Sequence, residues 1–485
     1  MNGTLKRIAV ACLLMFGLLM ANVTYLGAVK AEGLRKDPRN VRAFLARYNV
    51  DRGWITADDG KVTLAKTVDT GSKDYRFARE YPEGKPFAHV VGFFAPESSS
   101  GIEAAEGRYL DGSHPDMVVR RAVDLISGKP AKGASVDLTL NAEAQKIAYK
   151  GLAGTGKRGA VVAMDPKTGA ILTMVSVPSY DPNPLAVADK AKVNDAYRKL
   201  DKNKDKPLLN RAINLTYAPG STFKVITAAA YLQDDTSRDE NTVLDAPDSL
   251  PLPNTNLSLK NYHGESCGGR ATLLEALTIS CNTPFAQMGM DLGYDKMKKQ
   301  AAKFGIGSSL EIPLSVNPSD IGPEEDKAAL AMTSIGQRSN QMTPLQMAMV
   351  AAGIANRGTV MKPYLVSKIV GPDGSEIDST RPKELDEAVS PEVADELTKM
   401  MINVVQRGTG SRAQLPGITV AGKTGTAETE PGKPSHAWFI AFAPAEDPKV
   451  AVAVFIEAGS AGNDATGGVI AAPIAHDVMR AVLGR

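Results

Sequence analysis

The stretch Pro219-Gly220-Ser221-Thr222-Phe223-Lys224 places a serine and a lysine three positions apart at the start of a predicted helix. Residues i and i+3 of a helix share a face, so the Lys224 amine is directed towards the Ser221 hydroxyl. A serine becomes a good nucleophile when a neighbouring base takes its proton, and a lysine whose charge is suppressed can be that base. Backbone N–H groups at the helix start favour negative charge developing on Ser221 and on a bound carbonyl. The pattern predicts covalent catalysis at Ser221.

A second candidate motif is Ser280-Cys281-Asn282, which ends an apolar, helix-like run and leads into a turn. Its Ser280 and Asn282 side chains can project from that turn towards a cleft. The tripeptide Ser315-Val316-Asn317 has the same form, but Pro313 and Pro318 bracket it and indicate a loop. We therefore expect Ser280 and Asn282 to belong to the site.

A third motif, Lys423-Thr424-Gly425-Thr426, follows Ser221 and lies on a predicted strand, where Gly425 would let a substrate backbone approach closely. The earlier Lys167-Thr168-Gly169 is typical of a hairpin turn and is assigned to one. Two lysines in one cleft lower each other's pKa, which would help Lys224 act as a base while Lys423 meets a substrate carboxylate.

These three motifs, in this order and spacing, resemble the transpeptidase domain of the penicillin-binding proteins. The resemblance is strong over residues 150–485 and loose over residues 31–150. It is nearest to the class B type called penicillin-binding protein A. It implies a peptidoglycan D,D-transpeptidase that cross-links stem peptides through a serine acyl-enzyme, is inhibited covalently by β-lactams and needs no cofactor.

The resemblance also implies a role for each motif residue. Ser221 would attack the D-Ala-D-Ala carbonyl, Lys224 would take its proton, and Ser280 would relay a proton to the leaving amine. The backbone N–H groups of Ser221 and Thr426 would form the oxyanion hole. The expected substrate-binding residues are Asn282, Lys423, Thr424, Gly425 and Thr426.

Apolar segments around the motifs predict an α+β fold. A hairpin is expected at 159–175, and buried strands are expected at 417–421, 437–442 and 450–456. Strands at both ends of a domain with helices between them indicate one central antiparallel sheet packed against a helical lobe, which is the α/β sandwich that the family resemblance implies. Helices are expected at 222–232, 271–280, 284–304, 343–356 and 468–483.

The N-terminal part predicts a membrane anchor and a small module. Residues 8–29 carry no charge and are long enough to cross a membrane, with a cleaved signal peptide as the alternative. Residues 1–7 would be a cytoplasmic tail, 31–150 a β-rich pedestal or dimerisation-like module, and 151–485 the transpeptidase domain. The catalytic interpretation places the module and the transpeptidase domain outside the cytoplasm of a bacterium, held by a single-pass membrane anchor.

Composition argues against two other classes of partner. The formal net charge is +2, without a basic stripe that could follow a phosphate backbone, so we expect no nucleic-acid binding. The five histidines are scattered without metal-binding spacing, so no metal site is predicted.

Cys267 and Cys281 are the only cysteines outside the apolar segment. An oxidising exterior would permit a disulfide between them, and closing so short a loop could stabilise the fold by about 3 kcal/mol. Two free buried thiols are the alternative.

Several functions remain open beside cross-linking. A D,D-carboxypeptidase transfers the same acyl group to water, and a β-lactamase adds a base that activates water, for which no segment can be assigned. A non-catalytic β-lactam sensor or division scaffold would not need all of Ser221, Lys224, Ser280 and Lys423. The stretch 31–150 is too short for the glycosyltransferase domain of the class A type, so a separate membrane glycan polymerase is an expected partner.

Overall fold

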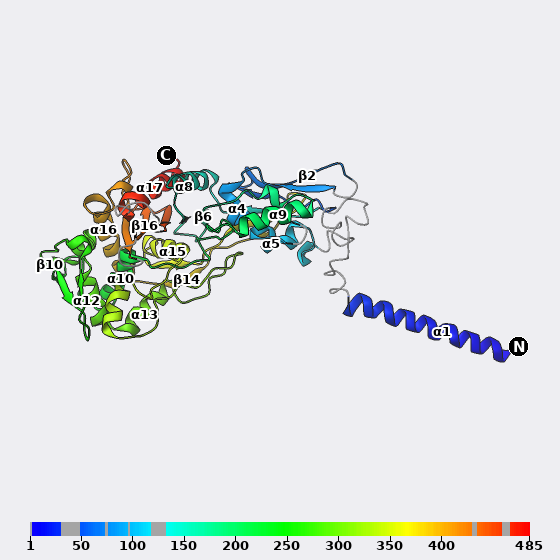
Figure 1. The fold of residues 1–485 in the computed structure, drawn as a ribbon, viewed down its shortest axis with the longest axis horizontal. Coiled ribbons are helices and arrows are strands. Elements are labelled where there is room, and N and C mark those ends of the chain that lie inside the picture. Colours follow the sequence, from blue (N-terminus) through cyan, green and yellow to red (C-terminus); the bar gives the residue numbers. More distant parts are fainter. Residues whose placement is uncertain are drawn as a thin grey trace.

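The structure is a computed structural model, and it describes residues 2–30, 49–72, 76–95, 98–117, 132–428, 434–457 and 466–485. Parts of the predicted 31–150 module, namely 31–48, 73–75, 96–97 and 118–131, and the first residue of the predicted 1–7 tail lie outside these ranges. In Figure 1 the chain forms two adjoining sheet-containing regions, with the first helix drawn away from both.

A five-stranded antiparallel sheet forms the centre of the larger region, in the order β15-β16-β17-β5-β6. The predicted hairpin forms as β5 (Gly159–Met164) and β6 (Ile171–Val177), and the last two predicted strands form as β16 (His436–Ala443) and β17 (Val450–Ile456). The strand predicted at 417–421 is instead β15 (Ala421–Ala427), so Lys423, Thr424, Gly425 and Thr426 lie within it. The α+β fold class is confirmed.

Helices cover both faces of this sheet. Alternate residues of a strand face opposite sides, so Phe439 packs with α8 (Ala142–Gly154) and α17 (Ala472–Val482), while Ile440 packs on the side of α15 (Pro344–Ala355). The central strands are buried on both faces, which accounts for their nearly continuous apolar sequence.

The helical lobe is formed by elements that lie between β6 and β15 in the chain. Two of the predicted helices differ in their limits. The run 284–304 divides into α12 and α13 because Gly293 adopts a left-handed φ of 81°. The run 271–280 begins later, since Gly269–Thr272 form β10, which pairs with β7 (Val243–Ala246), and Thr272 then caps α11 through a capping box with Glu275. The lobe comprises η5 (Gly220–Phe223), α10 (Lys224–Asp234), α11 (Leu273–Thr278), α12 (Thr283–Leu292), α13 (Tyr294–Lys303), α14 (Lys327–Ser334) and α16 (Pro391–Arg407).

A second, six-stranded sheet has the order β13-β12-β4-β1-β2-β3. Its N-terminal strands are β1 (Ile55–Ala57), β2 (Val62–Asp69), β3 (Phe77–Glu80) and β4 (Ser135–Leu138). The other two, β12 (Val366–Val370) and β13 (Glu376–Ser379), come from the C-terminal half of the chain, and β12 pairs with β4. The β-rich module is therefore tied to the larger region by shared strands.

Shorter elements complete both regions. Three further strand pairings are β8 with β9, β10 with β7 and β11 with β14. The remaining elements are η2 (Lys85–Phe87), α4 (Ala88–Val91), α5 (Gly101–Ala105), α6 (Gly107–Leu110), η3 (Pro115–Met117), η4 (Asn183–Leu185), α9 (Lys190–Asp201), β8 (Ser249–Pro251), β9 (Ser258–Lys260), η6 (Tyr262–Gly264), β11 (Thr359–Met361), β14 (Glu384–Glu387), η7 (Ser411–Ala413) and η8 (Gly467–Ala471).

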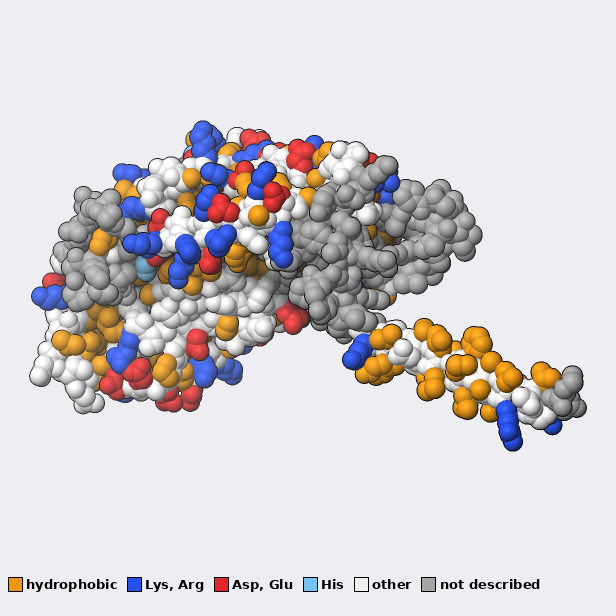
Figure 2. Space-filling model, turned by 45° about the vertical axis from the view of Figure 1, so that its right-hand side comes forward, with side chains coloured by type: hydrophobic (Ala, Val, Ile, Leu, Met, Phe, Trp, Pro, Cys, Tyr) orange, Lys and Arg blue, Asp and Glu red, His pale blue; other side chains and the backbone are white. Residues whose placement is uncertain are grey.

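The N-terminal segment is helical as α1 (Asn2–Thr24) and η1 (Tyr25–Val29). Figure 2 shows apolar side chains along the face of this helix that is turned to the viewer. Within the described ranges it is the one helix long and apolar enough to cross a membrane, spanning Gly3–Val29 with a mean hydropathy of 2.0 and no burial against the rest of the chain. Such a helix is suited to a lipid surrounding.

Candidate active site

The three predicted motifs meet at one cavity of about 900 Å³. Ser221 comes from η5, Ser280 and Asn282 come from the junction of α11 and α12, and Thr424 and Thr426 come from β15; all five line the cavity. A groove between a sheet edge and a helical lobe is thus bordered by hydroxyl and amide groups from distant parts of the sequence.

Glycines allow the turn that carries Ser221 to lie against β15. Gly220 adopts a φ of 54°, and a Cβ there would lie 2.5 Å from the carbonyl oxygen of Thr426. A Cβ at Gly425 would lie 2.7 Å from the Pro219 carbonyl oxygen and 2.9 Å from Thr222 Cγ2. The absence of a side chain at Gly425 therefore lets the turn that carries Ser221 pack against β15, and the expected approach of a substrate backbone to Gly425 stays a prediction.

Ser221 lies in a single 3₁₀ turn, and the α-helix begins only at Lys224. The turn is fixed from both sides. The Gly220 N–H donates to the Gly336 carbonyl at 2.9 Å, and the Trp438 indole N–H donates to the Ala218 carbonyl at 2.9 Å. Ser221 remains partly exposed and is presented to the cavity.

The Lys224 side chain is fully buried and points to the second motif. Its Nζ donates to the Ser280 carbonyl at 2.7 Å and to Asn282 Oδ1 at 2.7 Å, and it lies 3.4 Å from Ser280 Oγ. Burial, followed by the charge of Lys423, holds the Lys224 pKa well below its ordinary value. Among the described residues no hydrogen bond joins Lys224 to Ser221, a contact that in many enzymes tightens only when substrate binds.

Lys423 reaches the same serine from the sheet. Its Nζ donates to Ser280 Oγ at 2.8 Å and to the Thr424 carbonyl at 3.1 Å. The side chain is fully buried, and burial lowers the pKa of Lys423 to about 7. The Ser280 hydroxyl therefore lies between two amines whose charge is suppressed, an arrangement suited to passing a proton.

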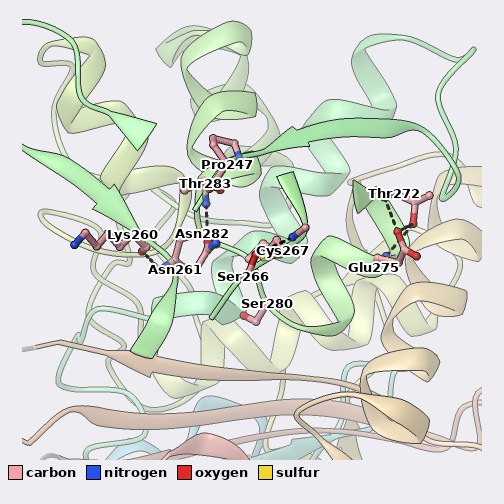
Figure 3. Close-up of a disulfide and its surroundings, with 12 residues drawn as sticks. Pro247, Lys260, Asn261, Ser266, Cys267, Thr272, Glu275, Ser280, Asn282 and Thr283 are labelled. Carbon is pink, nitrogen blue, oxygen red and sulfur yellow. Dashed lines mark hydrogen bonds between the residues drawn. A yellow bond between two sulfur atoms is a disulfide. The ribbon is translucent and has the colours of Figure 1, made fainter. Parts of the chain in front are cut away.

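A disulfide joins Cys281, the central residue of the second motif, to Cys267 (Figure 3). Ser280 adopts a left-handed φ of 65°, a conformation that side-chain-bearing residues keep only where their surroundings impose it. Asn261 Oδ1 accepts from the Asn282 N–H at 2.8 Å, and Asn282 Nδ2 donates to the Lys260 carbonyl at 3.0 Å. The motif is thus held by covalent and hydrogen bonds to the preceding loop.

The two alternative motifs lie elsewhere. Lys167 and Gly169 form part of the turn between β5 and β6, where Lys167 pairs with Asp447 on the surface. Asn317 donates from Nδ2 to the Asn214 carbonyl, and neither it nor Ser315 lines the cavity.

Sequence reasoning did not identify the part of the cavity wall that follows α16. Thr409 Oγ1 lies 2.6 Å from Thr424 Oγ1, and Ser411 and Arg412 continue the wall. The sequence Gly408-Thr409-Gly410 marks a turn there, but no spacing relates it to Thr424.

Comparison with known proteins gives a consistent picture. Residues 159–480 match the family model described as the penicillin binding protein transpeptidase domain, and residues 52–136 match the penicillin binding protein A dimerisation domain. Peptidoglycan D,D-transpeptidase PbpA of Mycolicibacterium smegmatis is 46% identical, covering 100% of this chain and 99% of the relative. PbpA of Mycobacterium tuberculosis strain H37Rv is 44% identical with the same coverage of both chains.

Solved structures are similar over most of the chain. Penicillin-binding protein A from M. tuberculosis, as a ceftriaxone acyl-enzyme complex, matches with a TM-score of 0.87 at 43% identity, covering 90% of this chain and 100% of that one. Its penicillin G acyl-enzyme complex matches with a TM-score of 0.84 at 44% identity, covering 89% of this chain and 99% of that one.

Proposed function

This chain belongs to the penicillin-binding protein transpeptidase family and is a serine-type peptidoglycan D,D-transpeptidase, and from that premise we propose how its residues carry out the reaction. It cross-links stem peptides through an acyl-enzyme and is inhibited covalently by β-lactams. The contacts of the Ser280 hydroxyl support the assignment of residues most strongly. Lys224 of the first motif and Lys423 of the third motif both approach this hydroxyl, and Ser221 lines the same cavity.

Acylation begins when Ser221 Oγ attacks the carbonyl of the donor's D-Ala-D-Ala peptide bond. Neutral Lys224 accepts the serine proton, which its lowered pKa favours. Negative charge on the carbonyl oxygen is stabilised by the backbone N–H groups of Ser221 and Thr426. The fixed position of Gly220 against Thr426 supports this pairing.

The tetrahedral intermediate then expels D-alanine. Lys224 returns a proton through Ser280 to the leaving amine, so the C–N bond breaks as the amine becomes neutral. The acceptor's amino group attacks the acyl-enzyme and loses a proton along the same route in reverse. A new peptide bond forms as the ester bond to Ser221 breaks. The cross-linked product is released, and the serine recovers its proton.

The substrate-binding residues divide by their location. Asn282 holds the donor's backbone amide, while Thr424 and Thr426 offer hydroxyls to its terminal carboxylate from the wall of the cavity. Lys423 contributes positive potential and orients Ser280. Gly425 acts by giving room to the turn of the nucleophile.

The chain acts at a bacterial cell membrane. Residues 1–7 are a cytoplasmic tail and 8–29 are a single-pass anchor, which the apolar helix Gly3–Val29 supports. The module at 31–150 and the transpeptidase domain at 151–485 lie outside the cytoplasm, where stem peptides are joined. A separate membrane glycan polymerase supplies the strands to be cross-linked.

A donor assay with and without acceptor tests this function. Purified chain is incubated with a stem-peptide thioester donor, and release of thiol and formation of cross-linked product are followed with an amine acceptor present or absent. Transpeptidation requires that the acceptor appear in the product. Hydrolysis alone would indicate a carboxypeptidase, and fluorescent penicillin labelling without donor turnover would indicate a sensor. Ser221→Ala should abolish turnover, whereas Ser237→Ala, on an exposed loop after α10, should not.

A further inference from the structure

The geometry points to Arg412 as the residue that supplies the positive charge for the donor's terminal carboxylate, and thereby as a determinant of substrate specificity. The inference rests on the proposed function. It assigns a recognition role to a side chain that lies outside all three motifs, on the short turn η7 that follows α16.

Lys423 is poorly placed to be the whole counter-charge. Its side chain is fully buried, and its ammonium donates to Ser280 Oγ and to the Thr424 carbonyl. With its pKa lowered to about 7, Lys423 carries only part of a positive charge near neutral pH. A fully ionised carboxylate would gain more from a cation that stays charged.

Arg412 is a lining residue of the same cavity that meets that requirement. It lines the cavity together with Thr409, Thr424 and Thr426. A guanidinium remains protonated in proteins, and its planar donors match the two oxygens of a carboxylate. A guanidinium and hydroxyl groups in one cavity can give a carboxylate charge-assisted hydrogen bonds, which are stronger than those to a neutral group.

The position of Arg412 is fixed by its neighbours. Its Nη1 donates to the Val469 carbonyl at 3.2 Å. The chain before that carbonyl is tightly packed, because a Cβ at Gly468 would lie 2.2 Å from the Thr409 carbonyl oxygen and one at Gly467 would lie 2.0 Å from that of Trp438. One donor of the guanidinium is thus used to hold it in place.

The other guanidinium donors of Arg412 have no hydrogen-bond partner among the described residues. Within the parts of the chain that the structure describes, Arg412 forms no ion pair and its one hydrogen bond is that to Val469. The carboxylates that line the same cavity are Glu265 and Glu428, and neither is within ion-pair distance of Arg412. An incoming carboxylate therefore meets a cation that no carboxylate of the described residues neutralises.

The inference is tested with two compounds that differ only in the carboxylate, benzylpenicillin and its methyl ester. Second-order acylation rate constants are measured for the unaltered chain, Arg412→Gln, Arg412→Lys and the control Arg407→Gln. Arg407 is exposed in the last turn of α16 and does not line the cavity. Thermal unfolding of each protein establishes that it is folded.

Arg412→Gln should slow acylation by benzylpenicillin about 10- to 100-fold, as expected for loss of one charge-assisted contact, and change the slower reaction of the ester less than twofold. Arg412→Lys should recover part of the loss, and Arg407→Gln should behave as the unaltered chain. Equal slowing with both compounds, or no slowing with either, would overturn the role of Arg412 while leaving Ser221 as the nucleophile. Failure of the unaltered chain to react with benzylpenicillin would instead overturn the proposed function.

Discussion

Lys423 Nζ lies 2.8 Å from Ser280 Oγ, although 143 positions separate the two residues in the chain. The contact joins the edge strand β15 to the turn between α11 and α12. Lys224 reaches the same Ser280 from η5 and α10, so a single hydroxyl connects all three motifs. The catalytic arrangement therefore depends on the packing of the helical lobe against the sheet.

Removal of the Ser280 hydroxyl should impair catalysis without unfolding the chain. We expect Ser280→Ala to slow acylation by penicillin about 10²- to 10³-fold, the range for a lost proton-transfer group. The comparison is Ser315→Ala in the alternative Ser-x-Asn sequence, which does not line the cavity and should leave the rate unchanged. Similar rates for both variants in a stopped-flow acylation assay would exclude a proton-relay role for Ser280.

The buried charge of Lys423 should make the protein's stability depend on pH. The folded pKa is about 7, against 10.5 for an ordinary lysine, so the unfolded chain binds more protons between these values. The free energy of unfolding therefore rises with pH across this window, and the contribution is lost as pH falls towards 7. The lowered pKa of Lys224 also makes the free energy of unfolding rise with pH.

Lys423→Met should remove the Lys423 contribution to this pH dependence, leaving that of Lys224, and should remove most activity. Its gain in unfolding free energy over the unaltered chain should be largest at pH 6 and should decrease by on the order of 3–5 kcal/mol towards pH 10.5. Lys167→Met, at an exposed lysine of the alternative motif, is the control and should show no such trend. A pH-independent difference in urea unfolding would mean that Lys423 is not neutralised in the fold.

The Cys267–Cys281 disulfide should both stabilise the chain and position the second motif. Because Cys281 lies between Ser280 and Asn282, we expect Cys267→Ser to lower the free energy of unfolding by about 3 kcal/mol and to slow acylation. Dithiothreitol should lower the free energy of unfolding and the acylation rate of the unaltered chain and of Cys12→Ser alike. It should change neither quantity in Cys267→Ser. Unchanged acylation after complete reduction would show that the backbone hydrogen bonds accepted by Asn261 Oδ1 suffice to hold the motif.

The N-terminal module contains a buried ion cluster that should be essential to its stability. Glu103 is fully buried and accepts from Arg52 at 2.9 Å and from Arg79. Burial raises the pKa of Glu103, but the charges of Arg79 and Arg52 outweigh it and leave the pKa below its ordinary value.

Glu103→Ala would leave two arginines buried without a counter-charge, and we expect it to lower the unfolding free energy of the module by about 3–5 kcal/mol. Glu80→Ala, which removes an exposed pair with Lys66, should cost less than about 1 kcal/mol. Calorimetry distinguishes the two, and equal melting temperatures would contradict the importance of the cluster.

The sequence was sufficient to locate the motif residues because each motif is local. The Ser221–Lys224 spacing, the turn after the apolar run at 271–280 and the apolar strands at 437–442 and 450–456 are all visible within short windows. The third motif was correctly placed on a strand, but the strand expected at 417–421 begins only at Ala421, because the small and polar residues of β15 give no apolar run that marks its limits.

Other features depend on long-range contacts that no local pattern encodes. The pairing of β12 with β4 joins residues more than 200 positions apart, so the extent of the second sheet was not predictable. Thr409 and Arg412 both contact the chain that follows Thr466, which is distant in sequence from the three motifs. The residues proposed as nucleophile and base could thus be located from the sequence, but the cavity wall that surrounds them could not.

The most direct test of the central claim is to locate the acyl group. The chain is reacted with benzylpenicillin and digested with trypsin, and the fragment 212–224 is sequenced by tandem mass spectrometry. The adduct should lie on Ser221, at one acyl group per chain, and Ser221→Ala should remain unmodified. An acyl group on any other residue, or stable acylation of Ser221→Ala, would contradict the assignment of the nucleophile and the mechanism built on it.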